Sequence, residues 1–452
     1  MSARFEKSLS DLGRSLSGSV VGPADAEYDA ARRCFNAFVD RRPAVIVRCA
    51  GTDDVATAFD FARTHELGIA VRGGGHNPAG HCVLDDGLVI DLSAMRAVDV
   101  DPDARIAHAD GGSTWLDFDA ATQAFGLVTP GGIVGSTGVC GLTLGGGIGH
   151  LTAQHGLTCD NLVGAEIVTP NGAVIRATQD ENAELLWALR GGGGNFGVAT
   201  RLEFQLHTLD RVVGGVLAYR GKGVREALRL FRDVAAQFPR DLSCQASLSV
   251  DESLAPTLGI LPCFTGADTQ SEELRVLRSA PGLVADSLRA HSFLDQQRVE
   301  DSPYGENRHY WKGHFVRELP DELLDELLRR IVALGRHPGG ILIESLHGAA
   351  KDAEASSGVV GFRDAAFNVS AQAVWQDPAL DEQHIQWARD TAAAIEPWSF
   401  SGGGYVNYMQ ADEPIERVRA AFGDDAFERL QALKTRYDPR NVLRRNQNIP
   451  PV

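Results

Sequence analysis

The stretch 70-AVRGGGHNPAGH-81 sets three consecutive glycines directly before His76 and places a proline two residues after it. Consecutive glycines let backbone N–H groups turn toward one anion, because no Cβ stands in the way. Pro78 stiffens the backbone on the other side of the imidazole. The turn therefore presents one histidine on a backbone with free donors, which suits a ligand that carries phosphate.

Two further glycine clusters follow within the first 200 residues. They are 145-GGGIG-149 and 191-GGGGNFG-197, and the run 129-TPGGIVGSTGVCG-141 lies just before the first of them. None matches the G-x-G-x-x-G pattern of an ordinary Rossmann fold, and none is the G-x-x-x-x-G-K-[ST] of an ATP-binding P-loop. Several such loops in one region predict a large ligand with several polar parts, such as a dinucleotide.

Composition narrows the class of protein. The chain has 452 residues, enough for two or three domains. Lys and Arg number 43 against 60 Asp and Glu, a formal net charge of −17 that disfavours nucleic-acid and membrane partners. The N-terminus lacks an apolar signal segment, and the seven scattered cysteines form no C-x-x-C pair. We therefore expect a cytoplasmic protein without a disulfide framework or a metal site.

The first 210 residues alternate strand-like and helix-like runs that glycine loops interrupt. Residues 26–39 have the apolar spacing of an amphipathic helix. Two hairpins are expected, one turning at Asp101-Pro102-Asp103 and one at Pro170-Asn171-Gly172, because these residue types favour tight turns.

After about residue 210 the pattern changes. Helical spacing occurs in 224–238, 319–334 and 381–395, between strand-like runs at 244–250, 257–264, 340–348 and 366–375. Long strands separated by helices predict an antiparallel sheet backed by helices, and we assign the chain to the α+β class.

The glycine turn is accompanied by other distinctive segments: 131-GGIVGSTGVCGLTLGGGIGHLTAQHGLTCDNL-162, 184-ELLWALRGGGGNFGVAT-200, 403-GGYVNYMQADE-413 and 437-YDPRNVLRRNQNIPP-451. Together they resemble the FAD-linked oxidases of the vanillyl-alcohol oxidase superfamily, in the branch of berberine bridge enzyme and 6-hydroxy-D-nicotine oxidase. The resemblance spans about residues 25–450.

The resemblance implies a domain plan and a cofactor. A PCMH-type FAD-binding domain of two α/β subdomains would occupy residues 1–210, with its core at about 39–209. A substrate domain would occupy 211–402, and 403–452 would return to the FAD domain. The flavin-linking histidine of the family falls on His76, which would bond to the 8α-methyl group of FAD. The other implied cofactor positions are Arg72, Gly73, Gly74, Gly75, Asn77, Gly80, His81, Gly138, Cys140, Gly141, Gly145, Gly146, Gly149, Asp160, Asn161, Gly194, Asn195, Phe196, Gly197, Val198, Asn446 and Asn448.

Many relatives hold the flavin through a cysteine as well. In this sequence Val134 occupies the position of that cysteine, and Cys140 comes six residues later. We therefore expect a single histidyl link and a structural role for Cys140, with a second link through Cys140 as the alternative. The family relates a small residue just after the cysteine position to reaction with dioxygen, and the matching Thr137 is compact.

Flavin oxidation needs a base or hydrogen-bonding group over the ring. The candidates are Tyr405, Asn407 and Tyr408, and an extended strand would place the first two on one face and Tyr408 on the other. A tyrosine base would need a pKa below its usual value of about 10. Glu344 and His347 are further candidates, on opposite faces of a strand. Of the remaining polar or aromatic positions, Tyr310 and Lys312 are weaker candidates, Gln372 and Val374 could line the pocket, and Trp375 is expected in the core.

We predict an FAD-dependent enzyme that oxidises a small alcohol, sugar, amine or secondary metabolite and returns electrons to dioxygen as hydrogen peroxide. A dehydrogenase or an oxidative cyclase on the same fold is the enzymatic alternative. The non-enzymatic alternatives are a flavin-binding protein without catalysis and a glycine-rich fold without flavin. The oligomeric state, monomer or homodimer, stays open.

Overall fold

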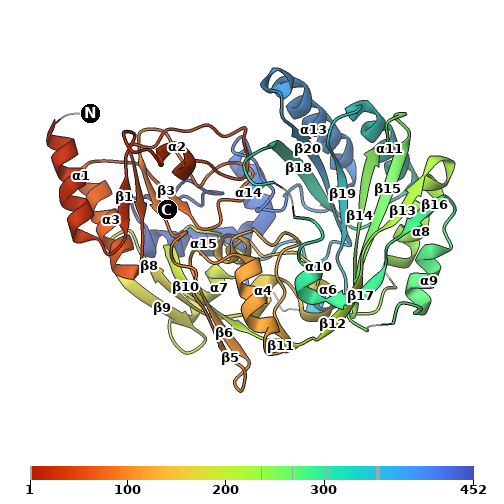
Figure 1. Cartoon of the computed structure of the whole chain (residues 1–452), viewed down its shortest axis with the longest axis horizontal. Helices are drawn as coiled ribbons and strands as arrows, with labels where there is room; N and C mark the ends of the chain where they lie inside the picture. The colour runs from red at the N-terminus through yellow and green to blue at the C-terminus, as the bar shows by residue number, and fades with distance from the viewer. Residues whose placement is uncertain (1–2, 236, 267, 302, 353–356) are drawn as a thin grey trace.

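The computed structural model describes residues 3–235, 237–266, 268–301, 303–352 and 357–452. Figure 1 shows two lobes side by side, one formed by the N-terminal part of the chain and the other by its middle part. The helices α14 (Ile415–Phe422) and α15 (Asp424–Tyr437) return to the first lobe, where the C-terminus also lies. The mixture of helices and mainly antiparallel sheets confirms the predicted α+β class.

The first sheet positions the glycine turn. Within the described residues its order is β1-β2-β4-β3, with β1 (Ser19–Val21), β2 (Val45–Arg48), β3 (Ile69–Arg72) and β4 (Leu88–Asp91). Strands β2, β4 and β3 are parallel, and helices α1 (Ala3–Ser15) and α3 (Thr52–Thr64) pack on them. Because β3 ends at Arg72, the turn at 73–75 leaves from the carboxyl edge of parallel strands, where such sheets bind ligands.

The second sheet is antiparallel, with the order β5-β6-β10-β8-β9 in the described chain. Its strands are β5 (Val98–Asp101), β6 (Ile106–Asp110), β8 (Leu162–Val168), β9 (Val174–Thr178) and β10 (Val198–Gln205), and helices α4 (Trp115–Gln123) and α7 (Ala183–Leu189) pack against it. Both predicted hairpins are confirmed, as β5–β6 and β8–β9. The cluster at 191–197 leads directly into β10, and β7 (Leu127–Val128) pairs with β11 (His207–Thr208).

The third sheet takes its nine strands from residues 211–375 of the described chain, and their pairing is antiparallel throughout. The main order is β16-β13-β15-β14-β19-β20-β18. The strands are β12 (Arg211–Gly214), β13 (Leu217–Arg220), β14 (Leu242–Val250), β15 (Pro256–Phe264), β16 (Leu283–Asp286), β17 (Arg289–Ser292), β18 (Arg308–Val316), β19 (Gly339–Ser345) and β20 (Phe367–Trp375). Helices α8 (Val224–Ala235), α9 (Glu272–Arg278), α11 (Asp321–Leu334) and α13 (Asp381–Ile395) lie on its outer face (Figure 1), which confirms the predicted helix-backed sheet.

The two faces of this third sheet differ in polarity. Ala246, Ile343 and Val369 share one apolar core with the covering helices. Their neighbours in β14, β19 and β20 point the other way, because side chains alternate along a strand. That second face carries Gln245, Ser247, Glu344, Asn368, Ser370 and Gln372, and it is the face turned toward the first lobe.

The predicted helix over 26–39 is wrong: only α2 (Tyr28–Ala31) forms. The guanidinium of Arg72 donates to the carbonyl oxygens of Ala31 and Arg33, the latter over 2.6 Å. A longer helix would need those acceptors for its own N–H groups. The chain instead turns away, and Phe35 stacks on His76.

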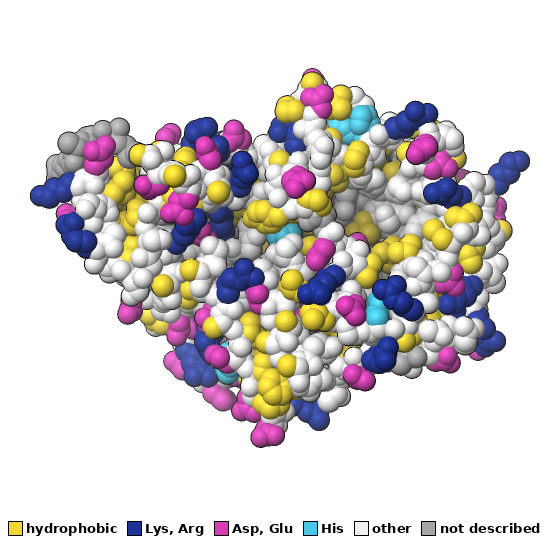
Figure 2. All heavy atoms as spheres, in the orientation of Figure 1, with side chains coloured by type: hydrophobic (Ala, Val, Ile, Leu, Met, Phe, Trp, Pro, Cys, Tyr) yellow, Lys and Arg dark blue, Asp and Glu magenta, His cyan; other side chains and the backbone are white. Residues whose placement is uncertain are grey.

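The other helices of the described chain are short: α5 (Val139–Leu144), α6 (Thr152–His155), α10 (Phe293–Gln296) and α12 (Ala349–Asp352). Among the described residues, no helix has both the length and the apolar character that crossing a bilayer requires. Basic and acidic side chains are interspersed over the face of the molecule shown in Figure 2.

A buried lysine ties the C-terminal segment to the third glycine cluster. Lys434, in α15, is fully buried, and its Nζ donates to Asp438 Oδ2 over 2.8 Å. The same ammonium donates to the carbonyl oxygens of Asn195 and Leu443, each over 2.9 Å. One charged group therefore links α15, the 191–197 loop and the segment that follows α15.

Replacing this lysine with an apolar residue should destabilise the protein. In Lys434→Met the buried Asp438 carboxylate loses its counter-ion, a change that costs about 3 kcal/mol, and thermal melting should move to a clearly lower temperature. Arg440→Met removes the same charge from an exposed position of the same segment and should melt like the parent protein. Equal melting temperatures for the two variants would contradict this role for Lys434.

Candidate functional site

A cavity of about 640 Å³ lies between the first lobe and the polar face of the third sheet. Cofactor and ligand sites typically occupy roughly 300–1,000 Å³. All three glycine clusters reach its wall, together with segment 405–408 and strands β14, β18, β19 and β20. The predicted site residues on this wall are Gly73, Gly74, Gly75, His76, Asn77, His81, Gly138, Cys140, Gly141, Gly145, Gly194, Gly197, Val198, Tyr405, Asn407, Tyr408 and Asn446.

His76 is held in one orientation at the end of the glycine turn. Its Nε2 lies 2.8 Å from Ser136 Oγ, and its Nδ1 lies 3.5 Å from Thr137 Oγ1. Its ring stacks on Phe35, with the ring centroids 4.4 Å apart. Burial lowers the pKa of His76 to about 3, and nearby His309 adds to the effect. The imidazole is therefore neutral at physiological pH and keeps the lone pair that a nucleophile needs.

The wall has room and polar partners for a large ligand. A Cβ added at Gly141 or Gly194 would meet no atom within 4 Å, so both glycines border open space. Two buried wall atoms, Asn446 Oδ1 and Arg445 Nε, have no hydrogen-bond partner in the described chain. Glycine backbone, an arginine and an unpaired amide oxygen together fit the diphosphate and heterocycles of FAD.

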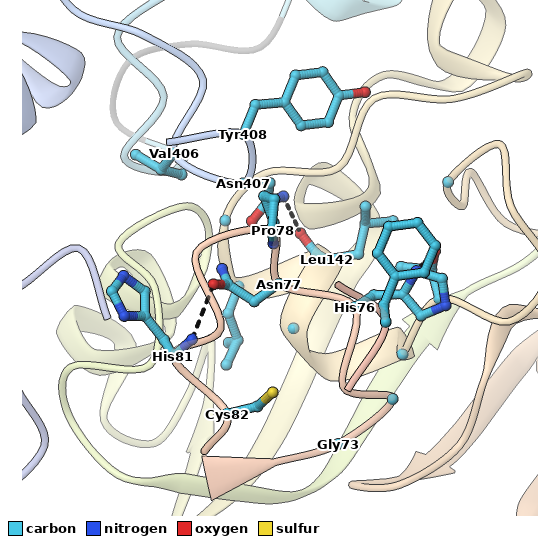
Figure 3. Close-up of a pocket in the computed structure, with 18 of the residues that line it drawn as sticks. Gly73, His76, Asn77, Pro78, His81, Cys82, Leu142, Val406, Asn407 and Tyr408 are labelled. Carbon is cyan, nitrogen blue, oxygen red and sulfur yellow. Dashed lines mark hydrogen bonds between the residues drawn. The ribbon is translucent and has the colours of Figure 1, made fainter. Parts of the chain in front are cut away.

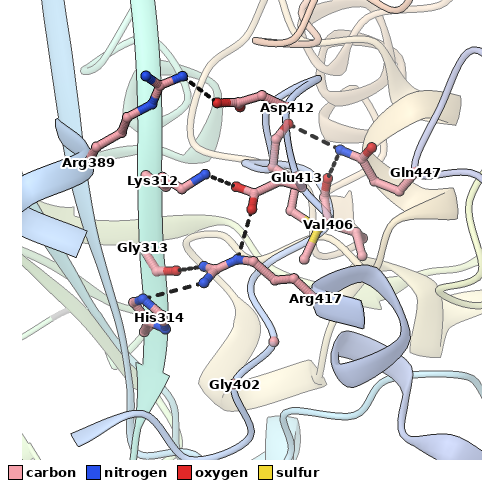
Figure 4. Close-up of polar contacts among 12 residues, drawn as sticks. Lys312, Gly313, His314, Arg389, Gly402, Val406, Asp412, Glu413, Arg417 and Gln447 are labelled. Carbon is pink, nitrogen blue, oxygen red and sulfur yellow. Dashed lines mark hydrogen bonds and ion pairs between the residues drawn. The ribbon is translucent and has the colours of Figure 1, made fainter. Parts of the chain in front are cut away.

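Segment 405–408 forms a turn, so the prediction of an extended strand is wrong. Tyr408 N donates to Tyr405 O over 2.8 Å, and the two rings come within 4.8 Å of each other on one side of the chain. Gln447 stabilises the turn, because its Nε2 donates to Val406 O over 3.2 Å and to Met409 O over 3.1 Å (Figure 4). The C-terminal segment thus supplies bonds that a strand would take from a neighbouring strand.

Tyr405 is surrounded by donors. Its Oη accepts from Gly147 N at 3.0 Å, from Ile148 N at 3.1 Å and from Asn407 Nδ2 at 3.0 Å. In Figure 3, Asn407 also reaches back to Leu142, above the loop that carries His76. Burial nevertheless raises the pKa of Tyr405.

Burial raises the pKa of Tyr408 too, well above its ordinary value. Neither tyrosine therefore has the lowered pKa that a tyrosine base would need. In Tyr405 the loss of hydration outweighs even three hydrogen bonds, and in Tyr408 the neighbouring carboxyl group of Glu344 adds to the effect of burial.

Glu344 is the ionisable group behind Tyr408. Tyr408 Oη donates to Glu344 Oε1 over 3.3 Å, and Asn368 Nδ2 donates to Glu344 Oε2 over 2.7 Å. Burial raises the pKa of Glu344 to about 7 against these two hydrogen bonds. A carboxyl group that titrates near neutral pH, linked through a phenol to the cavity wall, can exchange protons with a bound molecule.

Other predicted candidates lie off the wall. His347 donates from Nε2 to a backbone carbonyl 3.0 Å away. From the opposite face of β18, Tyr310 reaches Asp412 and Lys312 reaches Glu413; Figure 4 shows the second of these contacts. Because side chains alternate along a strand, the other face of β18 lies against the cavity. As for the remaining predictions, Gln372 and Val374 do line the wall and Trp375 is buried.

Nine implied cofactor positions lie behind the wall rather than on it: Arg72, Gly80, Gly146, Gly149, Asp160, Asn161, Asn195, Phe196 and Asn448. Several of them support the wall. Asp160 pairs with Arg363 from the loop before β20, and Asn195 Oδ1 accepts from Ile449 N over 3.1 Å. The side chains of Asp160 and Asn195 are thus engaged with protein groups in this structure.

Sequence reasoning missed several wall residues, among them Phe35, Glu300, His309, Trp311 and Gln447. The period-two pattern of β18 could have located His309 and Trp311, once Tyr310 was assigned to the apolar core. Glu300 lies in a turn before β18, where no periodicity marks it. In the described chain no cluster of three or more His, Cys, Asp or Glu side chains could hold a metal ion.

Comparison with known proteins finds family models that match two segments of this chain. A family described as FAD binding domain matches residues 43–178, and one described as berberine and berberine like matches 404–450. (R)-6-hydroxynicotine oxidase of Paenarthrobacter nicotinovorans is 31% identical over 97% of this chain and 97% of that protein. The chain belongs to the berberine-like family of FAD-linked oxidoreductases. It is also 30% identical to an FAD-linked oxidoreductase of Dictyostelium discoideum, over 98% of this chain and 97% of that protein.

Solved structures of the family share this architecture. That of 6-hydroxy-D-nicotine oxidase from Arthrobacter nicotinovorans superimposes with a TM-score of 0.89 at 29% identity, covering 97% of this chain and 98% of that one. A chitooligosaccharide oxidase has a TM-score of 0.85 at 19% identity, over 98% of this chain and 99% of that one. The second likeness shows the fold alone. This FAD-linked oxidoreductase therefore has the predicted family fold.

Filling the cavity from Gly141 should displace the cofactor. In Gly141→Phe the ring would occupy the open space beside α5, so the flavin absorbance per mole of purified protein should fall several-fold. Gly141→Ala adds only a methyl group to open space and favours the helix, so it should keep its flavin and its melting temperature. A fully yellow Gly141→Phe variant would contradict this location for FAD.

Proposed function

We propose that this oxidoreductase holds FAD in the cavity through a single covalent link to His76, oxidises a small organic molecule at a C–O or C–N bond, and passes the electrons to dioxygen to give hydrogen peroxide. The observation that carries the proposal is the neutral imidazole held at the end of the glycine turn on the cavity wall. When bound, FAD supplies the two-electron acceptor. The seven free, buried cysteines of the described chain are consistent with action in the reducing cytoplasm.

A second link through Cys140 is disfavoured by its environment. Cys140 lies on the wall, but burial raises the pKa of its thiol to about 12. The thiolate is the reactive form of cysteine, and here it is scarcely populated at neutral pH. Val134, where many relatives have the linking cysteine, offers no nucleophile.

Tyr408 and Glu344 are the groups best placed to manage the substrate proton. Tyr408 lines the cavity and donates to Glu344, so an O–H or N–H of the substrate can reach the carboxylate through the phenol. Tyr405 and Asn407 form the floor beside them and orient one another through their hydrogen bond. Thr137, next to His76, is small enough to leave the wall open to dioxygen, which favours an oxidase over a dehydrogenase.

Removal of the imidazole tests the covalent link. After acid precipitation the parent protein should give a yellow pellet, and its tryptic peptide containing His76 should carry the added mass of FAD. His76→Ala should give a white pellet with any flavin free in the supernatant. His81→Ala, in the same loop and also on the wall, should keep the yellow pellet. A yellow His76→Ala pellet would assign the link to another residue.

The acid–base role of Glu344 gives a pH profile. The carboxylate accepts a proton only when ionised, so the rate of flavin bleaching by substrate under nitrogen should fall about tenfold per unit as pH drops below about 7. Glu344→Gln should bleach roughly 10²- to 10⁴-fold more slowly and lose that slope, and Tyr408→Phe, which removes the phenol between substrate and carboxylate, should also bleach more slowly and with a weaker slope. Stopped-flow absorbance measures both, and an unchanged profile in Glu344→Gln would exclude this base.

A further inference from the structure

A second carboxyl group stands beside Glu344 at the sheet end of the cavity. Glu300 lies on the wall, partly buried, and Gln245 Nε2 donates to its Oε1. Gln245 is directly opposite Glu344 in the β14–β19 register, a placement that puts the Cβ atoms roughly 4.5–5.5 Å apart. One amide side chain therefore stands next to both carboxyl groups.

Neither carboxyl group has a counter-ion in the part of the chain that the structure describes. In the described residues neither Glu300 nor Glu344 forms an ion pair, and their hydrogen-bond partners are Gln245, Asn368 and Tyr408, all uncharged.

The cationic side chains of the neighbouring strand β18 and helix α14 already form ion pairs. Lys312 and Arg417 both pair with Glu413, which is itself buried (Figure 4). At the other end of the cavity, Arg445 lies on the wall near His81. The cavity thus has a cationic end, which suits the diphosphate of FAD, and an acidic end formed by the sheet.

Two neighbouring acids, one buried and one partly buried, constrain what can bind there. Burial raises the pKa of Glu300 to about 7, and repulsion from Glu344 adds to the rise. Two such groups titrate as a pair, so near neutral pH they hold a proton between them. A buried negative charge is costly without a counter-ion, and a cationic ligand would supply one.

We infer that the substrate is an amine, bound as its ammonium ion with the nitrogen against Glu300, and that Glu300 selects amines over alcohols and sugars. This rests on the proposed function, whose oxidant is the bound FAD. The ammonium first gives one N–H proton to the carboxyl pair, which frees the nitrogen lone pair. Loss of hydride from the α-carbon then converts the C–N single bond into the C=N bond of an iminium ion. A neutral alcohol carries no charge that could balance the carboxylate, so it forms only a hydrogen bond with Glu300.

Two probes of equal shape test the charge requirement. N-methylbenzylamine is a cation at pH 7.5, and benzyl methyl ether is its neutral counterpart. Titrated into the holoprotein under nitrogen and followed by the flavin spectrum, the amine should bind at least tenfold more tightly than the ether. Glu300→Gln should remove that preference. Glu306→Gln, at an exposed position of the same segment, should retain it.

The pH dependence gives a second measurement that needs no variant. Glu344 and Tyr408 are the titratable groups that face Glu300, and Tyr408 stays protonated throughout the range. Affinity for the amine should therefore rise between pH 6 and pH 8 as the carboxyl pair ionises, whereas affinity for the ether should stay level.

Three results would overturn the inference: equal affinities for amine and ether, no binding of the amine, or a preference that survives in Glu300→Gln. If the same holoprotein carries FAD on His76 and an alcohol or sugar bleaches it, the proposed function stands without the amine specificity. A colourless parent protein would contradict both the proposed function and the amine specificity.

Discussion

The backbone of Gly74 crosses that of Gly138 so closely that neither position can carry a side chain. A Cβ on Gly74 would lie 2.4 Å from Gly138 N, and a Cβ on Gly138 would lie 2.5 Å from Gly74 N. The crossing joins the turn that leaves the first sheet to the loop that enters α5, and it brings His76 against Ser136 and Thr137. The position of the imidazole is therefore set by main-chain packing, which is less adaptable than contact between side chains.

The two lobes contribute different chemistry to one cavity. The first lobe offers glycine backbone and a single imidazole, and these groups suit a constant cofactor. The third sheet offers side chains from its polar face, such as Ser247 and Gln372, whose alternate neighbours hold the helices. Because alternation separates the two sets, residues of the polar face can change without disturbing the apolar core. This arrangement lets one fold serve substrates of different chemistry.

Local sequence predicted the elements that local interactions determine. Turn residues located both hairpins, alternation located the third sheet, and the glycine clusters located much of the cavity wall. The failures involve partners distant in sequence. Arg72 ends the helix predicted over 26–39, and Gln447 makes 405–408 a turn, so neither outcome could be inferred from the segment itself. Glu300 was missed for the same reason, since it meets Gln245 only in the folded protein.

The cavity is closed by residues from nearly opposite ends of the sequence. His81 Nε2 lies 3.2 Å from Gln447 Oε1, a contact between positions 366 residues apart. A chain emerging from the ribosome makes its N-terminal sheets long before Gln447 exists, because synthesis proceeds at roughly 5–20 residues per second. The complete cavity therefore cannot form on the nascent chain until translation has passed this segment.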